Sequence, residues 1–434
     1  MGLFLRPAPK HARCGSHRVV PAAETIRRVW PLARRLGVTR LADITGLDRL
    51  GIPTYSATVP RSRDILSVYN GKGANRLEAQ AGALMEAIER QAALRSDVER
   101  IQASPASLAG RELFLDPRGV NVDLASDYDE QRTYAWIWGH DLLRDEPILV
   151  PASLAAYLSG PAHGPTCFAT SSSHGLASGN TLEEAVCQAL CEIFERDTAT
   201  MAELGAHYVP LVRREVALGS AFREGPDDFE RWPCLALDDA PAPVPRLAAA
   251  FQGAGLTPIV RDITGDAGVP TVMATVADET VYGHPMAHLG YGTHPNAAVA
   301  VCRALAEAAQ SRVVDIHAVR EDILERDTPL GPRAARHTRR VSAVNRRSWF
   351  HAPGQRRRAF SDMLSRTHGD VLEDIHWLLD RARLAGFDRV IVVDLAPRLQ
   401  EARVVRVIVP NAETWGVDQS KLGPRATAWW RRHV

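Results

Sequence analysis

Apolar and polar residues follow two different periods along the chain, and these periods predict strands and helices in turn. Alternation at every second position predicts strands at 38–45, 53–59, 64–70, 134–139, 257–263, 271–276, 389–394 and 404–409. Apolar residues three and four positions apart predict helices from Pro21 through Leu36, over about 370–385, and after Asn75, Asn180 and Asn296. Helices and strands mixed in this way predict an α+β fold.

The three central helices repeat one short sequence. Ala-Leu-Met-Glu at 83–86 returns as Ala-Leu-Cys-Glu at 189–192 and, more loosely, as Ala-Leu-Ala-Glu at 304–307. An asparagine precedes each copy, and asparagine is a favoured N-cap; in two copies a glutamate follows it by three residues, as in a capping box. Small-residue loops precede the second and third helices, at 171–179 and 288–295. We therefore predict one strand–loop–helix unit used three times, with converging helix starts.

Each repeated helix places its charged residues on one face. At roughly 100° per residue, the stripes consist of Glu86, Glu89 and Arg90; of Glu184, Gln188, Glu192, Glu195 and Arg196; and of Arg303, Glu307 and Gln310. A single stripe of this kind is usually a solvated face with ion pairs one turn apart. One such stripe in each of three repeated units favours a second interpretation, in which the three charged faces line a shared pocket.

The composition is that of an ordinary globular protein, and it excludes several classes. Acidic residues number 51 and basic residues 52 among 434, so no bulk positive field attracts nucleic acid. No apolar run is long enough to cross a bilayer, and the chain start lacks the apolar segment of a signal peptide. Six cysteines in so long a chain fit a reducing compartment. We expect a cytoplasmic protein that binds neither nucleic acid nor membranes.

The residues before the first repeated helix suit an anion. Gly71-Lys72-Gly73 stands directly before it, and a glycine loop leading into a helix directs backbone N–H groups and the helix dipole at a bound anion. Lys72 adds a positive point charge there. The chain has neither a G-x-x-x-x-G-K-[ST] loop nor a G-x-G-x-x-G fingerprint.

Glutamates that converge on one pocket need cations. Carboxylates at close range repel one another unless positive charge neutralises them, and Mg²⁺ with oxygen ligands is the natural occupant. Arg90, Arg196 and Arg303 could then each hold phosphate oxygens through two hydrogen bonds. A polyphosphate bridged to the glutamates by Mg²⁺ satisfies all of these charges, so we infer nucleotide phosphoryl chemistry.

Four segments together resemble the YcaO family of ATP-dependent enzymes that modify peptide backbone amides. They are Gly-Lys-Gly at 71–73, Glu-x-x-Glu-Arg at 86–90, Glu184-x3-Gln188-x3-Glu192-x2-Glu195-Arg196-Asp197 and Arg303-x3-Glu307. The resemblance extends from about Ser67 to Pro410. The chain departs from the usual family pattern at Gly82 and Ala177, which replace serine, and at His174, which replaces the more common asparagine.

The resemblance implies an ATP site without a P-loop, in which glutamates hold Mg²⁺. It also implies that ATP phosphorylates the oxygen of a peptide amide after a nucleophile adds to the carbonyl carbon, and that loss of phosphate leaves an azoline, a thioamide or an amidine. The residues implied to contact the nucleotide are Lys72, Arg90, Ser173, Ser178, Asn180, Gln188, Arg196 and Arg303. The implied Mg²⁺ ligands are Glu86, Glu89, Glu184, Glu192, Glu195 and Glu307.

Residues 39–53 are similar to the lead-in of YcaO members that act with a TfuA-like partner and form thioamides. The chain also lacks the proline-rich tail typical of azoline-forming members. The resemblance thus implies thioamide formation in a ribosomal peptide or protein; an azoline-forming cyclodehydratase and a non-catalytic peptide- or nucleotide-binding scaffold are alternatives. It further implies a homodimer, an N-terminal preamble (1–62), a YcaO domain (63–410) and a C-terminal tail (411–434).

Overall fold

The computed structural model describes the chain except for residues 1–2, 12–16, 65, 157–163, 170–171, 211, 213–229, 279–285, 319–352, 416–420 and 434. The strands of the described part form sheets of three, five and six strands. Helices pack against all three sheets, which confirms the predicted α+β fold. None of the described helices combines the length and apolar character that a bilayer crossing requires.

The first sheet joins residues on both sides of position 62. Its antiparallel strands are, in order, β1 (Arg40–Asp43), β2 (Thr54–Thr58) and β3 (Val68–Lys72). Helix α2 (Arg76–Leu94) packs on β3 and β2, and α1 (Ala22–Arg35) packs on α2. The division of the chain at residues 62 and 410 stays a prediction.

The six-stranded sheet carries the second repeated helix. Its order is β4 (Ile101–Ala103), β5 (Tyr134–Asp141), β13 (Ile391–Asp394), β14 (Arg403–Ile408) and β7 (Leu176–Gly179), with β6 (Glu146–Pro151) paired to β5. Helix α5 (Leu182–Glu203) packs on β14 and β7, and α12 (Val371–Leu384) packs on α5. The shorter helices here are α3 (Pro105–Leu108), α4 (Ala152–Ala155) and α14 (Pro424–His433). An ion pair of 2.5 Å between Arg425 and Asp197 ties α14 to α5.

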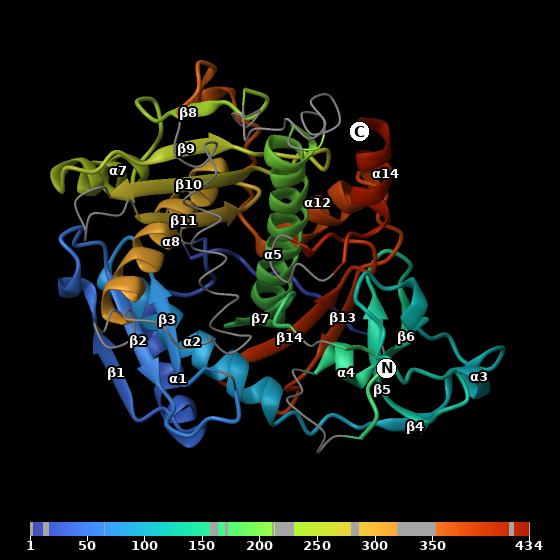
Figure 1. Ribbon diagram of the computed structural model, residues 1–434. Coiled ribbons are helices and arrows are strands. Elements are labelled where there is room, and N and C mark those ends of the chain that lie inside the picture. Colours follow the sequence, from blue (N-terminus) through green and yellow to red (C-terminus); the bar gives the residue numbers. More distant parts are fainter. Residues whose placement is uncertain are drawn as a thin grey trace, which may run out of the picture.

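The five-stranded sheet carries the third repeated helix. Its order is β11 (Met286–Thr293), β10 (Thr271–Asp278), β9 (Ile259–Asp262), β8 (Cys234–Ala236) and β12 (Arg357–Ala359). Helix α8 (Ala297–Ala318) packs on β11 and β10, and α7 (Val244–Gly253) packs on α8. In Figure 1 both smaller sheets lie to the left of α5, and most of the six-stranded sheet lies to its right.

The pairs β3–α2, β7–α5 and β11–α8 are the three repeated units, and each brings strand and helix unusually close. A methyl group on Gly71 would lie 2.1 Å from the backbone nitrogen of Ala83, and one on Gly290 would lie 2.2 Å from the carbonyl oxygen of Ala304. The same close approach to the following helix occurs at Gly179. The strand and helix backbones are so close that the strand positions require glycine, and small alanines on the helix face suit the same short distance.

Two of the predicted loops are partly strands. Residues 176–179 of the predicted loop 171–179 form β7, and residues 288–293 of the predicted loop 288–295 lie in β11; residue 171 lies outside the described residues. Glycine-rich sequence usually indicates a loop. Here the glycines lie in strands, where the absence of a side chain allows the backbone of the following helix to pack closely. Lys72 likewise ends strand β3 rather than standing in a loop.

The helix starts follow the predicted chemistry in two of three units. Asn75 accepts a hydrogen bond from the Glu78 N–H at 3.0 Å, and Asn296 accepts one from the Val299 N–H at 3.2 Å. The prediction for Asn180 is wrong, because the N-cap of α5 is Thr181. A threonine hydroxyl accepts the same kind of helix-start hydrogen bond, so the next residue takes the role.

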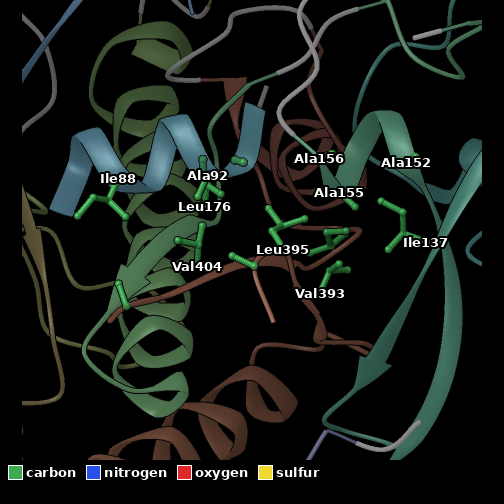
Figure 2. Close-up of a cluster of buried hydrophobic side chains, with 14 of the residues drawn as sticks. Ile88, Ala92, Ile137, Ala152, Ala155, Ala156, Leu176, Val393, Leu395 and Val404 are labelled. Carbon is green, nitrogen blue, oxygen red and sulfur yellow. The ribbon is translucent and has the colours of Figure 1, made fainter. Parts of the chain in front are cut away.

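A continuous apolar core holds α2 against the six-stranded sheet. Figure 2 shows Ile88 and Ala92 of α2 near Leu176 of β7, Val404 of β14 and Val393 of β13. These side chains are at most 6% exposed. Burial of one such aliphatic side chain stabilises a fold by about 1.5–3 kcal/mol, so the core sets the position of the charged face of α2 relative to α5.

We predict that Gly290→Ala lowers the free energy of unfolding by about 2 kcal/mol or more, because the added methyl group meets the α8 backbone and the helix must move. Urea denaturation measures the change. Gly119→Ala is the matched control, since no atom lies within 4 Å of its added methyl group. Equal stabilities of the two variants would contradict the close-packing argument.

Candidate functional site

A cavity of about 590 Å³ lies where α2, α5 and α8 face one another. Its walls include all fourteen residues predicted to contact nucleotide or Mg²⁺. These are Glu86, Glu89 and Arg90 of α2; Glu184, Gln188, Glu192, Glu195 and Arg196 of α5; Arg303 and Glu307 of α8; and Lys72, Ser173, Ser178 and Asn180. The charged stripes therefore face a common space rather than bulk solvent.

An ion pair connects the first and third repeated units across the cavity. Lys72 Nζ at the end of β3 lies 2.8 Å from Glu307 Oε2 on α8. The guanidinium of Arg196 lies 3.9 Å from Glu192 and 3.8 Å from Glu195, both on its own helix. Lys72 thus brings a positive charge from the first unit to an acid of the third.

The surroundings of Glu89 strongly oppose its ionisation. Burial, followed by repulsion from Glu86 and Glu192, raises its pKa to about 8. Burial is also the largest cause that raises the pKa values of Glu86 and Glu192. Burial therefore disfavours the charged form of the acids on the wall formed by α2 and α5.

The acids nearer to α8 divide into two kinds. Burial, with Glu307 and Glu192 acting against Arg196, raises the pKa of Glu195 to about 7. The pKa of Glu307 is lowered despite burial, because Lys72 and Arg196 stabilise its charge. Of Glu195 and Glu307, it is Glu307, in direct contact with Lys72, whose charged form the surroundings favour.

This donor set fits Mg²⁺. Mg²⁺ prefers carboxylate oxygens and water as ligands, and a divalent ion would stabilise the charged form of carboxyl groups whose ionisation burial disfavours. Over the described ranges, no three acidic, histidine or cysteine side chains already surround one metal position.

Hydrogen bonds engage both oxygens of Glu184. Its Oε1 accepts from the Val19 N–H at 2.6 Å, and its Oε2 accepts from the Asn180 N–H and Nδ2, each at 2.8 Å. Arg18 reaches the same face of α5 and donates to Gln188 Oε1 at 3.4 Å. The N-terminal segment therefore closes one end of the cavity.

Sequence analysis did not find this contribution of the N-terminal segment. Arg18 and Thr25 both line the cavity, and Thr25 Oγ1 donates to Asn180 Oδ1 at 2.9 Å. No periodic pattern precedes Pro21, and a single arginine carries no local signal of a distant contact. Only the predicted helix after Pro21 could have placed Thr25 on a buried face.

Ser178 couples the second unit to the first. Its hydroxyl donates to the Met85 carbonyl at 3.1 Å, and the same side chain, close to Glu89, lowers the pKa of that carboxyl against the larger effect of burial. Ser178 is 8% exposed. It therefore fixes β7 against the acidic face of α2.

A model of one protein family matches residues 70–413, and that family is described as the YcaO cyclodehydratase, ATP- and Mg²⁺-binding. The chain belongs to the YcaO family. The family resemblance of the charged segments is thereby confirmed, and ATP and Mg²⁺ are the cofactors of this family.

Two uncharacterised relatives align with nearly the whole chain. A protein of Methanothermobacter thermautotrophicus is 34% identical over 94% of this chain and 98% of its own length. A protein of Rhizobium leguminosarum bv. trifolii, named for its place in the tfuA 3' region, is 32% identical over 94% of this chain and 92% of its own.

Solved YcaO-type structures share the fold. YcaO from Methanopyrus kandleri, bound with AMPPCP and Mg²⁺, superposes with a TM-score of 0.68 at 23% identity, covering 96% of this chain and 98% of that one. A heterocyclase in complex with substrate and cofactor gives a TM-score of 0.73 at 22% identity, covering 95% of this chain and 54% of that one.

We predict that Glu89→Gln reduces the pH dependence of stability in protein free of nucleotide and Mg²⁺. The folded pKa of about 8 exceeds the ordinary value of 4.5, so stability present below the ordinary value is lost as the pH rises through 8. Urea denaturation from about pH 5 to about pH 9 should show a smaller fall for Glu89→Gln than for the parent protein. Exposed Glu112→Gln is the control, and identical falls in all three proteins would refute this account of the acidic wall.

Proposed function

We propose that this protein uses ATP and Mg²⁺ to activate a backbone amide of a peptide or protein. The observation that carries the proposal is the convergence of the fourteen predicted residues on one cavity. Family membership supports it, since the family is described as an ATP- and Mg²⁺-binding cyclodehydratase. The heterocyclase with a similar fold is described in complex with substrate and cofactor.

The roles proposed for the cavity residues follow from their charges. Bound ATP supplies a phosphoryl group for the amide oxygen, and Mg²⁺ neutralises negative charge. We propose Glu86, Glu89, Glu192, Glu195 and Glu307 as the Mg²⁺ ligands, whereas a ligand role for Glu184 stays a prediction because its oxygens are engaged by the protein. Lys72, Arg90, Arg196 and Arg303 would face the phosphate oxygens, and Ser173, Ser178, Asn180 and Gln188 would contact the remainder of the nucleotide.

Rigid placement of these side chains is the contribution of the fold to the reaction. Arg303 donates to the Thr293 carbonyl at 3.0 Å, which orients its guanidinium at the end of β11. Lys72 is held between its own strand and Glu307. Positively charged groups fixed before the substrate arrives stabilise charge that develops on oxygen without reorganising.

We propose a thioamide as the product and a TfuA-like protein as the partner. The relative named for the tfuA 3' region supports this, since it aligns over almost the full length of both chains. The lead-in at residues 39–53 is built into the fold beside α8, where Arg312 lies 2.9 Å from both Asp48 and Asp278. Arg312 is 3% exposed, so this segment is an integral part of the protein.

Azoline formation is the second candidate product. The description of the matching family as a cyclodehydratase favours it. In that reaction a cysteine, serine or threonine side chain of the peptide is the nucleophile, and no external sulfur enters. A homodimer is a further prediction of the family resemblance.

Mass spectrometry of the product distinguishes these reactions. Incubation with ATP, Mg²⁺, sulfide, the TfuA-like partner and the peptide encoded beside the gene should replace one oxygen by sulfur at each modified amide. Loss of one water per site would instead indicate azoline formation. An unchanged peptide, despite nucleotide-dependent peptide binding, would indicate a non-catalytic scaffold and contradict the proposal.

We predict that Glu192→Gln lowers peptide-dependent ATP turnover about a hundredfold or more, because one of the charges that hold Mg²⁺ near the phosphates is lost. The isosteric change keeps the volume, so circular dichroism and thermal unfolding should remain those of a folded protein. Glu99→Gln, which changes an exposed acid outside the cavity, should retain full turnover. Unchanged turnover in soluble Glu192→Gln would refute the assigned site.

A further inference from the structure

A second cavity, of about 50 Å³, lies behind the wall of the large one. It is lined by the segment at 120–122, helix α4, Ser172 and His174, the end of β14 with the residues that follow it up to Thr414, and Ile193 of α5. Ser173 lines the large cavity, whereas the next residue, His174, lines the small one. Residues 172–174 therefore lie between the two cavities, and we call them the partition.

His174 carries unused hydrogen-bonding capacity into this cavity. Both of its ring nitrogens are buried and have no hydrogen-bond partner within the described part of the chain. Burial, and then the charges of Arg196 and Arg406, lower its pKa to about 3. The imidazole is thus neutral, with one N–H donor and one acceptor nitrogen, and both call for a partner because unpaired buried polar atoms are costly.

Asn121 presents a second unused group. It is 4% exposed, and its amide nitrogen donates to the carbonyl of Ala412 and to Glu413, each at 3.1 Å. Its Oδ1 is buried and has no hydrogen-bond partner among the residues that the structure describes. The cavity wall therefore offers an acceptor on one side and an imidazole on another.

The electrostatic environment of this cavity is positive. Arg406 lines it and is 2% exposed; Nε donates to the Ala155 carbonyl at 3.1 Å and Nη2 to the Ser172 carbonyl at 2.9 Å. No described aspartate or glutamate is among the lining residues. Arg196, on the other side of the partition, acts on the same imidazole. A small anion is therefore favoured over a cation.

We propose that this small cavity binds hydrosulfide, the nucleophile that thioamide formation requires, beside the nucleotide cavity. The proposal rests on the proposed function, since only a thioamide product needs an external sulfur. The volume excludes a nucleotide or peptide, because one water in the liquid already occupies about 30 Å³. The sulfur atom would accept a hydrogen bond from the His174 N–H, and the S–H group, a weak donor, would point at Asn121 Oδ1. His174 is then the residue that holds hydrosulfide in this cavity.

A direct binding experiment uses bromide, which matches hydrosulfide in charge and approximate size. Crystals of the full-length protein soaked in sodium bromide should show an anomalous peak within hydrogen-bonding reach of His174. The peak should vanish in His174→Leu and persist in His376→Leu, which removes an exposed imidazole of α12 that lines neither cavity. A small cavity that holds only water in the parent crystals would overturn the proposal.

A kinetic experiment tests the nucleophile itself. His174→Leu should raise the KM for sulfide about tenfold or more, as expected for loss of one hydrogen bond to a charged ligand, and should leave the KM for ATP unchanged. His174→Asn, which keeps an N–H donor, should recover part of the loss. Equal rises in the KM for sulfide and ATP would mean that His174 merely supports the partition, which would also overturn the proposal.

The two proposals fail separately. If no peptide gains sulfur, the thioamide function is wrong, yet the bromide peak and its loss in His174→Leu still decide whether an anion site exists. If peptides gain sulfur but the KM for sulfide is the same in His174→Leu and in the parent protein, the function stands and this site is wrong.

Discussion

Close contact between three strands and the helices that follow them allows like charges to share one cavity. Two unit charges about 4 Å apart repel by roughly 4 kcal/mol even at an effective dielectric constant of 20. That repulsion would separate α2, α5 and α8 unless packing held them. Ala83, Leu84 and Ile88 of α2 are all fully buried, and several aliphatic side chains at about 1.5–3 kcal/mol each outweigh one such repulsion. The uncompensated charge is then available for cations and phosphates.

The sequence was sufficient to predict the repeated units and the residues that line the cavity, because both depend on local patterns. Charged residues at helical spacing lie on one face of a helix, and three helices with the same charged face indicate a shared pocket. The helix starts at Asn75 and Asn296 follow from side-chain chemistry that acts over three residues. The acids and bases of the stripes were therefore found before any tertiary contact was known.

Features that depend on tertiary contact could not be predicted in this way. The strands β7 and β11 contain Gly179 and Gly290, whose role is visible only when a helix backbone lies against them. The closure of the cavity by Arg18 depends on a segment more than one hundred and fifty positions from α5 in the sequence. Asn180 shows the same limit, because it serves Glu184 and Thr25 rather than the helix start.

Arg196 connects the charge balance of the two cavities. On one side it faces Glu192 and Glu195, and on the other its charge acts on His174. While the large cavity lacks cations, the two carboxylates offset much of the guanidinium charge. Mg²⁺ bound to those carboxylates would take over that role, and more of the positive potential of Arg196 would reach the small cavity. Since coupling between two binding equilibria is reciprocal, an anion beside His174 would in turn strengthen Mg²⁺ binding. The arrangement therefore couples an anion beside His174 to Mg²⁺ on Glu192 and Glu195.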